Sequence, residues 1–399
     1  MSVPVKCLAT ALLLPICICL SGQTPDREHL QAGAYVRVSH VLDGHRIYER
    51  LIDSYDYDLY GLSVGLSTRP EDEDWFAHAW NYPDFGLGFS YARMGSLDFK
   101  NDSRLGDIAN LYGWAEFDLL RTRHFRFGPL LELGLSYSPE RYDWQTNPEN
   151  EFIGSRVFAV IGTGLRAEVL LAPQWAAQAG FYLTHHSNGM LRSPNLGINE
   201  MAVGIGLRHY MAPKVFVSRP PDPPDEPEWR KGLQWNVFAA AGVHSCRTEL
   251  KGILASGGPK GQGSPVPARA RLCAGAELMW RYTPIFATGI EAEFGYADNN
   301  YRGTDLILRG SEDPQGYSPF RAGLGFVQEC RYRQLSVHFV FGAYLYKRTG
   351  LTEDVGRSYQ KIGARYHFRR AGGLFAGLDM RAHQLDRSYS LEWSLGYNL

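Results

Sequence analysis

Short segments in which bulky apolar residues alternate with small or polar ones restrict the fold of this chain more than any other feature. In residues 388–399 every second residue is Tyr, Leu or Trp, and the residues between are Ser, Glu, Gly or Asn. Residues 57–67 alternate in the same way, with small Gly61, Ser63 and Gly65 against large neighbours. Successive side chains of a strand point to opposite faces, so each segment has one apolar face.

The alternating segments occur in a chain without a long apolar run after residue 22, which argues against a helical transmembrane span. The chain has 43 Gly and 23 Tyr, and 13% of its residues are aromatic. Many glycines and tyrosines with alternation in place of bulk hydrophobicity are typical of a transmembrane β-barrel. We therefore expect an all-β, antiparallel transmembrane barrel, with a secreted β-sandwich or propeller as the competing fold.

The N-terminus differs from the rest of the chain. Lys6 precedes an apolar run over residues 7–20, which ends in Ser21 and Gly22. The run is shorter than the roughly 20 residues of a spanning helix and contains Pro15. This pattern predicts a signal peptide over residues 1–22 rather than a signal anchor, and hence an exported protein.

Charge and cysteine content exclude some classes of function. A formal net charge of -1 argues against an electrostatic nucleic-acid binder. Cys246, Cys273 and Cys330 remain after the signal peptide, and their wide spacing predicts neither a metal site nor a disulfide framework. The sequence leaves open whether two of these cysteines form one disulfide bridge and the third is a free thiol. No cofactor is predicted.

Sixteen strands are expected, eight on each side of a proline-rich segment. The first eight are 33–41, 57–67, 84–94, 108–121, 124–138, 156–171, 174–187 and 199–210. The second eight are 229–244, 265–282, 285–297, 318–332, 334–347, 355–369, 374–384 and 388–399. Short turns near Thr122 and at Ala172-Pro173 contrast with long polar loops at the other strand ends, as in outer-membrane barrels.

Residues 219–228 carry five prolines and four acids, which favours an extended linker between two domains. Residues 376–383 also resemble residues 179–186, which indicates a duplicated unit. We therefore expect an eight-stranded barrel over residues 30–211 and a second, degenerate one over residues 229–399. The alternative is one barrel of sixteen strands.

The first half contains a cluster of polar residues at the end of one expected strand and the start of the next. By alternation, His185 and Ser187 share the apolar, outward face with Phe181, whereas His186 points to the other side. The same argument on the following strand places Asn199 outward and Glu200 inward.

A His and a Ser two positions apart on a strand have Cβ atoms roughly 6.5 to 7 Å apart, which lets imidazole reach hydroxyl. Such a pair can work as general base and nucleophile, and a third group on the far imidazole nitrogen fixes the tautomer. Asn199 can be that group, and Asn188 is a candidate for stabilising an oxyanion.

Residues 185–189 (His-His-Ser-Asn-Gly) and 194–199 (Pro-Asn-Leu-Gly-Ile-Asn) resemble the lipid A 3-O-deacylase family, also called acyloxyacyl hydrolases. The resemblance implies an eight-stranded outer-membrane barrel that removes the ester-linked 3-hydroxyacyl chain at position 3 of lipid A, without a metal. It matches His185 to the general base, Ser187 to the nucleophile and Asn188 to the oxyanion contributor.

The chain departs from the family pattern at the acid, because the family's glutamate falls on Asn199 and Glu200 is one residue late. We keep both residues as candidates for supporting the histidine. The resulting prediction is a membrane-embedded ester hydrolase of the outer membrane that acts on lipid A, or lipopolysaccharide, in the outer leaflet and binds no nucleic acid. The alternative is a non-enzymatic barrel, either a pore or a pseudoenzyme, in which His185 and Ser187 are a polar pair at a strand end.

Overall fold

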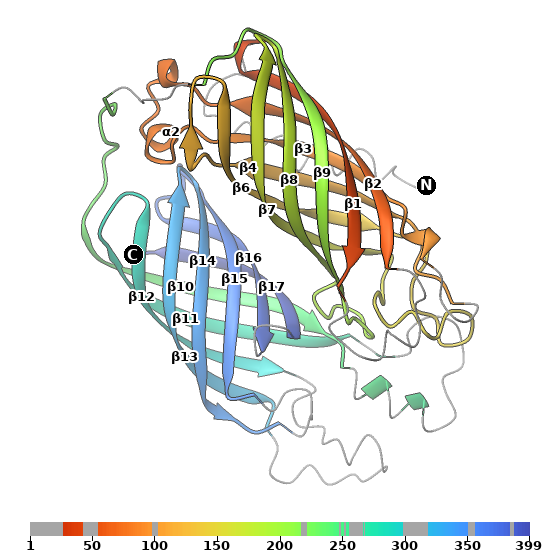
Figure 1. Cartoon of the computed structure of the whole chain (residues 1–399). Coiled ribbons are helices and arrows are strands. Elements are labelled where there is room, and N and C mark those ends of the chain that lie inside the picture. Colours follow the sequence, from red (N-terminus) through yellow and green to blue (C-terminus); the bar gives the residue numbers. More distant parts are fainter. Residues whose placement is uncertain are drawn as a thin grey trace, which may run out of the picture. The chain divides into compact units, whose positions relative to one another are not determined.

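The computed structural model describes residues 27–42, 55–97, 103–216, 222–246, 249–250, 253–254, 266, 268–297, 318–349, 356–383 and 387–399. The predicted signal peptide and residues 219–221 of the predicted linker lie outside these ranges. The chain divides into two compact units, one with strands β1–β9 and one with β10–β17; residues 143–145 and 188–195 group with the second. Each unit contains a barrel, coloured red to green and green to blue in Figure 1.

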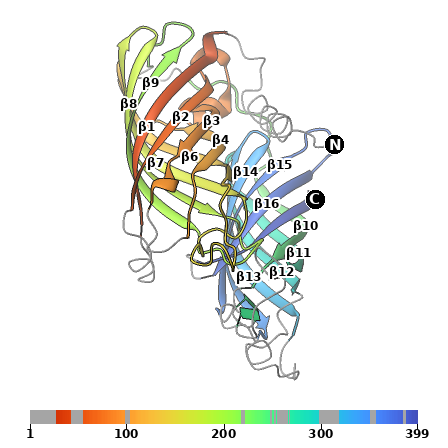
Figure 2. The same ribbon diagram turned by 90° about the vertical axis from the view of Figure 1, so that its right-hand side faces the viewer.

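The first unit is a closed antiparallel barrel of eight long strands and one short one (Figure 2). β1 pairs with both β2 and β9, and the pairing of β4 with β6 closes the sheet. The strands are β1 (Leu30–Val41), β2 (Asp56–Ser67), β3 (Asp84–Ala92), β4 (Ile108–Glu116), β5 (Leu120–Arg121), β6 (Phe125–Tyr137), β7 (Val157–Ala172), β8 (Trp175–Ser187) and β9 (Ile198–Tyr210).

The second unit is a closed barrel of eight strands, in which β10 pairs with both β11 and β17. Its strands are β10 (Gly232–His244), β11 (Arg269–Arg281), β12 (Phe286–Ala297), β13 (Phe320–Tyr332), β14 (Leu335–Lys347), β15 (Ser358–His367), β16 (Leu374–His383) and β17 (Arg387–Asn398). The prediction of two antiparallel eight-stranded barrels is confirmed, and the alternative of one sixteen-stranded barrel is wrong.

The outer faces of both barrels are apolar. Leu62 and Val203 in the first barrel are 62% and 61% exposed, and Phe341 and Trp393 in the second are 56% and 55% exposed. A closed barrel pairs every strand edge, which is what a lipid environment requires of a β-structure. The alternation in the sequence therefore produces two surfaces suited to hydrocarbon.

Buried charged pairs fill the interiors. In the first barrel Arg37 donates two hydrogen bonds to Glu132, at 3.1 and 2.6 Å, and in the second Arg365 binds Glu277 through both terminal nitrogens. Eight strands leave just enough interior for side chains. Removing one partner of such a pair would cost about 3–5 kcal/mol, because the other charge would stay buried alone.

One expected strand is interrupted. The prediction extended a single strand over residues 108–121, but β4 ends at Glu116 and β5 has two residues that pair with β6 alone. Opposite the break, Pro129 of β6 has no N–H to donate, and a Cβ at Gly128 would lie 1.9 Å from the Phe117 carbonyl oxygen. The Phe117 and Leu119 N–H groups still donate to the Pro129 and Phe127 carbonyls, both at 2.9 Å, and the register then shifts by one residue before Leu120 pairs with Phe127. Pro129 removes one bond from the ladder, and Gly128 allows the close approach of the Phe117 carbonyl.

The helices of the described residues are short, and none has the length and apolar character needed to span a membrane. They include η1 (Arg27–His29), η3 (Pro70–Asp72), α2 (Trp75–Ala79) and η4 (Met94–Ser96), and residues 249–250 and 253–254 are also helical. Asp74 begins α2 as its N-cap, because its carboxylate accepts from the Phe76 N–H at 3.1 Å.

The remaining predictions concern the linker and the cysteines. Residues 222–230 have no helix or strand, and the linker over residues 219–228 stays a prediction. Cys246, Cys273 and Cys330 are all described, and no disulfide joins them. The bridge that the sequence left open is therefore not formed.

Candidate active site

The end of β8 and the start of β9 bring His185 and Asn199 together. The two residues are direct cross-strand partners in the β8–β9 ladder. Their side chains meet at 2.7 Å between Nδ1 of His185 and Oδ1 of Asn199. The register of β8 and β9 therefore places the amide of Asn199 beside Nδ1 of His185.

The contact determines which imidazole nitrogen is available. Oδ1 of an amide only accepts hydrogen bonds, so Nδ1 of His185 carries the proton and donates it to Asn199. In the neutral ring Nε2 then keeps its lone pair. A histidine in this tautomer can take a proton from a nearby hydroxyl.

A glycine holds the imidazole of His185 from one side. Gly197 has φ +73°, and a Cβ there would lie 2.8 Å from Cε1 of His185. Its N–H donates to the Phe152 carbonyl at 3.1 Å, which fixes the backbone in this position. Any larger residue would be strained by its φ and would displace the ring.

Ser187 is the last residue of β8, two positions after His185. Alternation puts both side chains on the same face, roughly 6.5 to 7 Å apart at Cβ. Ser187 is only 4% exposed, whereas the apolar residues before it on this face, Phe181 and Leu183, are each 42% exposed. The hydroxyl is thus more sheltered than its position on the outward face predicts.

Asn188 is engaged within its own loop. Its backbone N–H donates to Oδ1 of Asn195 at 3.0 Å, and its Nδ2 donates to the Arg192 carbonyl at 2.8 Å. An amide nitrogen carries two hydrogens, so this bond leaves one for another acceptor. The loop contacts therefore fix Asn188 without using all of its donors.

His186 and Glu200 lie on the inner face of the barrel, as alternation predicts. His186 is fully buried, with Nε2 at 3.2 Å from Oδ1 of Asn110. Oε1 of Glu200 is 4.0 Å from Nδ1 of His186, and this carboxylate points away from the face that carries His185. The structure therefore brings together His185 and Asn199, and separately His186 and Glu200.

Gly197 is a further residue of this site, which alternation along the strands does not predict. It belongs to the Pro-Asn-Leu-Gly-Ile segment, and its position depends on a backbone contact with a loop about 45 residues earlier in the chain. A glycine just before an expected strand is a weak signal by itself. Within the described residues, no group of His, Cys, Asp and Glu side chains could hold a metal ion.

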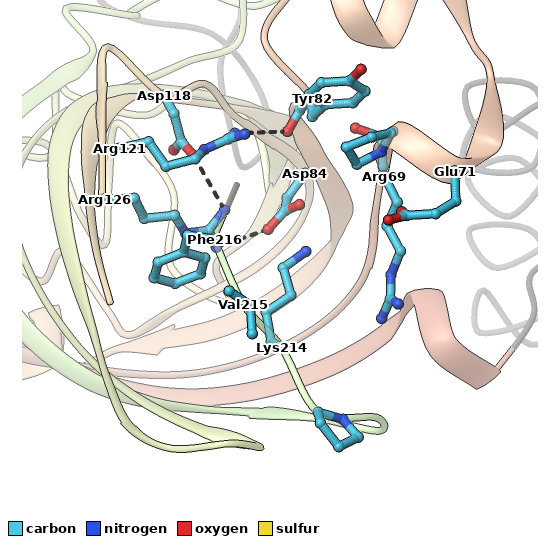
Figure 3. Close-up of a pocket in the computed structure, with 13 residues that line it drawn as sticks. Arg69, Glu71, Tyr82, Asp84, Asp118, Arg121, Arg126, Lys214, Val215 and Phe216 are labelled. Atoms are coloured by element: carbon cyan, nitrogen blue, oxygen red, sulfur yellow. Dashed lines mark hydrogen bonds and ion pairs between the residues drawn. The ribbon is translucent and has the colours of Figure 1, made fainter. Parts of the chain in front are cut away.

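A separate pocket of about 240 Å³ lies at the opposite end of the first barrel. Figure 3 shows Lys214 pointing into it toward Asp84, which is ion-paired with Arg126 at 2.8 Å. Burial of Lys214, which follows β9, lowers the pKa of its ammonium group to about 8. None of the predicted site residues lines this pocket.

Two family models match the chain. The model described as lipid A 3-O-deacylase (PagL) matches residues 60–208, and the model described as acyloxyacyl hydrolase, C-terminal domain, matches residues 234–399. The first match includes every candidate site residue, and the second covers the second barrel. No curated protein matches the chain.

Solved structures similar to the chain are barrels. A de novo designed transmembrane β-barrel is 13% identical, with 47% of this chain and 97% of that chain covered and a TM-score of 0.23. OccK5 (OpdH) of Pseudomonas aeruginosa is 12% identical, with 94% and 99% covered and a TM-score of 0.21. A mutant porin of Rh. blastica is 8% identical, with 93% and 99% covered and a TM-score of 0.19.

With TM-scores this low, these structures are not evidence for the fold of this chain. The strand pairings of the two closed barrels establish the fold. The family matches agree with the barrel architecture and point to the outer membrane. The acyloxyacyl hydrolase C-terminal model covers the second barrel and the lipid A 3-O-deacylase model covers most of the first, and the first barrel belongs to the lipid A 3-O-deacylase family.

Proposed function

We propose that the first barrel removes the 3-O-linked acyl chain of lipid A by a serine-histidine mechanism. The observation that carries the proposal is the 2.7 Å bond from His185 to Asn199, two strand positions before Ser187 on the lipid-facing side. The family that matches residues 60–208 is named for its action on lipid A, and this match supports lipid A as the substrate.

The first step is attack of the Ser187 hydroxyl oxygen on the ester carbonyl carbon. Nε2 of His185 takes the hydroxyl proton, and the new imidazolium keeps its Nδ1 proton on Asn199. The carbonyl oxygen becomes an oxyanion, for which the second Nδ2 hydrogen of Asn188 is the donor we assign.

Collapse of this intermediate breaks the ester bond to the sugar oxygen, which takes the proton from Nε2 of His185. The acyl chain is then an ester of Ser187. Water, deprotonated by the same nitrogen, releases the fatty acid and restores the serine. Each proton taken by His185 is returned, so the cycle balances without a cofactor.

Asn199 orients the imidazole of His185 through a hydrogen bond and has no charge with which to stabilise the imidazolium. Its amide fixes the ring and tautomer but stabilises the imidazolium less than a carboxylate would. Glu200 stays a weaker candidate for this role, because its carboxylate lies on the inner face beside His186.

The site's place in the membrane fits the substrate. If the N-terminus begins in the periplasm, β8 runs outward and ends at the outer leaflet, with the long loops outside as is usual for these barrels. His185 and Ser187 would then face the acyl esters of lipopolysaccharide. A pore is disfavoured by the buried ion pairs inside both barrels.

Mass spectrometry of lipid A from cells that express the chain tests the proposal. We expect lipid A lighter by one 3-hydroxyacyl group, and unchanged lipid A with Ser187→Ala. Unchanged lipid A with the intact, correctly inserted chain would instead favour a pseudoenzyme. Heat-modifiable mobility on gels would establish insertion and folding of both proteins.

A further inference from the structure

The interior of the second barrel holds two buried arginines whose donors are largely unused. Arg271 on β11 and Arg321 on β13 have side chains that are each 1% exposed. Within the described part of the chain, Nη1 and Nη2 of Arg271 and all three side-chain nitrogens of Arg321 have no hydrogen-bond partner. A buried guanidinium group without a hydrogen-bond acceptor destabilises the folded state, because its lost hydration is not replaced. A bound ligand with acceptor oxygens would supply the missing partners of both arginines.

The nearest carboxylate cannot satisfy them. Both groups approach Oε1 of Glu392, with Nε of Arg271 at 3.1 Å and Nη2 of Arg321 at 3.7 Å. That oxygen also accepts from Nε of Arg381 at 3.3 Å and from Ser390 at 2.7 Å. Since Oε1 already accepts three hydrogen bonds, it has no lone pair left for Arg321.

The surrounding charges favour an anion. Among the residues that the structure describes, the connected ion pairs contain four cations and three carboxylates, namely Arg271, Arg321, Arg381 and Lys361 with Glu392, Glu293 and Glu291. Arg381 and Lys361 are occupied by Glu293 and Glu291, which leaves Arg271 and Arg321 as the groups with spare donors. One more negative charge would balance the cluster.

The position of the pair identifies the side from which a ligand comes. Arg271 is near the start of β11 and Arg321 near the start of β13, at the end of the barrel where the connections 245–268, 298–319 and 348–357 are long. Long loops of outer-membrane barrels usually face outward. The planar fork of arginine matches the oxygens of phosphate, which two guanidinium groups can chelate together.

We propose that Arg271 and Arg321 form a binding site for a phosphate group at the outward end of the second barrel. The phosphate is either free inorganic phosphate or the phosphate of a lipid headgroup. This site is independent of the deacylase chemistry, because it lies wholly in the second barrel.

Equilibrium dialysis of the full chain in detergent against labelled inorganic phosphate, at constant ionic strength, tests the site. We expect saturable binding of about one phosphate per chain, weakened tenfold or more by Arg321→Gln. The matched control is Arg357→Gln, which removes an exposed arginine at the same barrel end and should change the affinity less than twofold.

A second variant keeps both charges. A Cβ at Gly295 would lie 2.7 Å from Nε of Arg321, the movable end of a flexible side chain. Gly295→Ala should therefore leave the barrel folded, shown by heat-modifiable mobility, yet weaken phosphate binding severalfold. Binding unchanged by both Arg321→Gln and Gly295→Ala would overturn the proposal.

The two sources are distinguished by nanodiscs that contain lipid A with its phosphates or after their enzymatic removal. Preferential retention of phosphorylated lipid A, lost with Arg321→Gln, would identify a lipid headgroup. Binding of inorganic phosphate without that preference would identify the free anion. Absence of both would mean that water alone satisfies the two arginines, contrary to the proposal.

Discussion

The strand pairs β8–β9 and β16–β17 are corresponding parts of two barrels, and they differ on one face. Each pair carries a buried inner histidine: His186 contacts Asn110, and His383 contacts the Tyr344 hydroxyl at 3.0 Å. On the other face, β8 carries His185, whose cross-strand partner is Asn199, whereas β16 has Ala382 at the position before its inner histidine. The inner histidine thus belongs to the common scaffold.

The connections differ as well. Residues 188–197 join β8 to β9 and contain Asn188 and Gly197, whereas only residues 384–386 join β16 to β17. The residues of the proposed chemistry therefore lie on one outward face and one loop of the first barrel, and the second barrel has neither. The second copy keeps a different polar feature, the Arg271 and Arg321 pair.

The largest effect should come from removing the outward histidine. His185→Ala removes the proposed general base, so we expect deacylation of lipid A to fall by about 10³-fold or more. The rate of fatty-acid release measures it. His383→Ala, in the second barrel, should leave the rate within about twofold; equal losses in the two variants would contradict the assignment.

Much of the fold could be predicted because alternation is a local signal. The alternation of side chains along each strand predicts where the strands lie and that they form two barrels. It also predicts which face carries Asn199 and which carries Glu200. The interruption after β4 could not be predicted from β4 itself, since the ladder also depends on the opposite strand, where Pro129 of β6 has no N–H to donate.

Alternation also predicts the outward position of the site residues that lie on strands, His185 and Asn199. The close contact of Gly197 with His185 depends on backbone pairing with Phe152, a long-range contact without periodicity. The buried state of Ser187 depends on packing at a strand end, where alternation no longer determines exposure.

A smaller effect is expected at the amide that orients the histidine. Asn199→Ala removes the 2.7 Å contact and should slow deacylation about tenfold to a hundredfold, whereas Asn199→Glu should accelerate it by stabilising the imidazolium. Glu200→Gln serves as the inner-face comparison and should change the rate less than about threefold. A large loss with Glu200→Gln and none with Asn199→Ala would reverse these roles.

Gly197→Ala should have a moderate effect, a loss of about three- to tenfold, because its Cβ would press on Cε1 of His185. Gly232→Ala is a matched control in the second barrel. Gly232 also has positive φ, +139°, but nothing lies within 4 Å of its Cβ position. Comparing the deacylation rates of the two variants separates the effect of backbone strain from that of displacing the imidazole. Equal rates would show that Gly197 does not position His185.

The smallest effect should appear at the opposite end of the first barrel. The pKa of Lys214, about 8 because of burial, is below its ordinary value of 10.5. Between these values the unfolded chain binds more protons, so the stability contributed by this group rises as pH rises through that window. Lys214→Met should flatten the rise in the thermal midpoint between pH 8 and pH 10 and leave deacylation within about twofold.

The central claim is that Ser187 is activated by His185 on the outward face of the first barrel. Labelling the intact protein in detergent with a serine-reactive fluorophosphonate, followed by peptide mass spectrometry, tests it directly. We predict an adduct on Ser187 that is lost in His185→Ala and kept in His383→Ala. An unlabelled Ser187 in a preparation that deacylates lipid A would contradict the account.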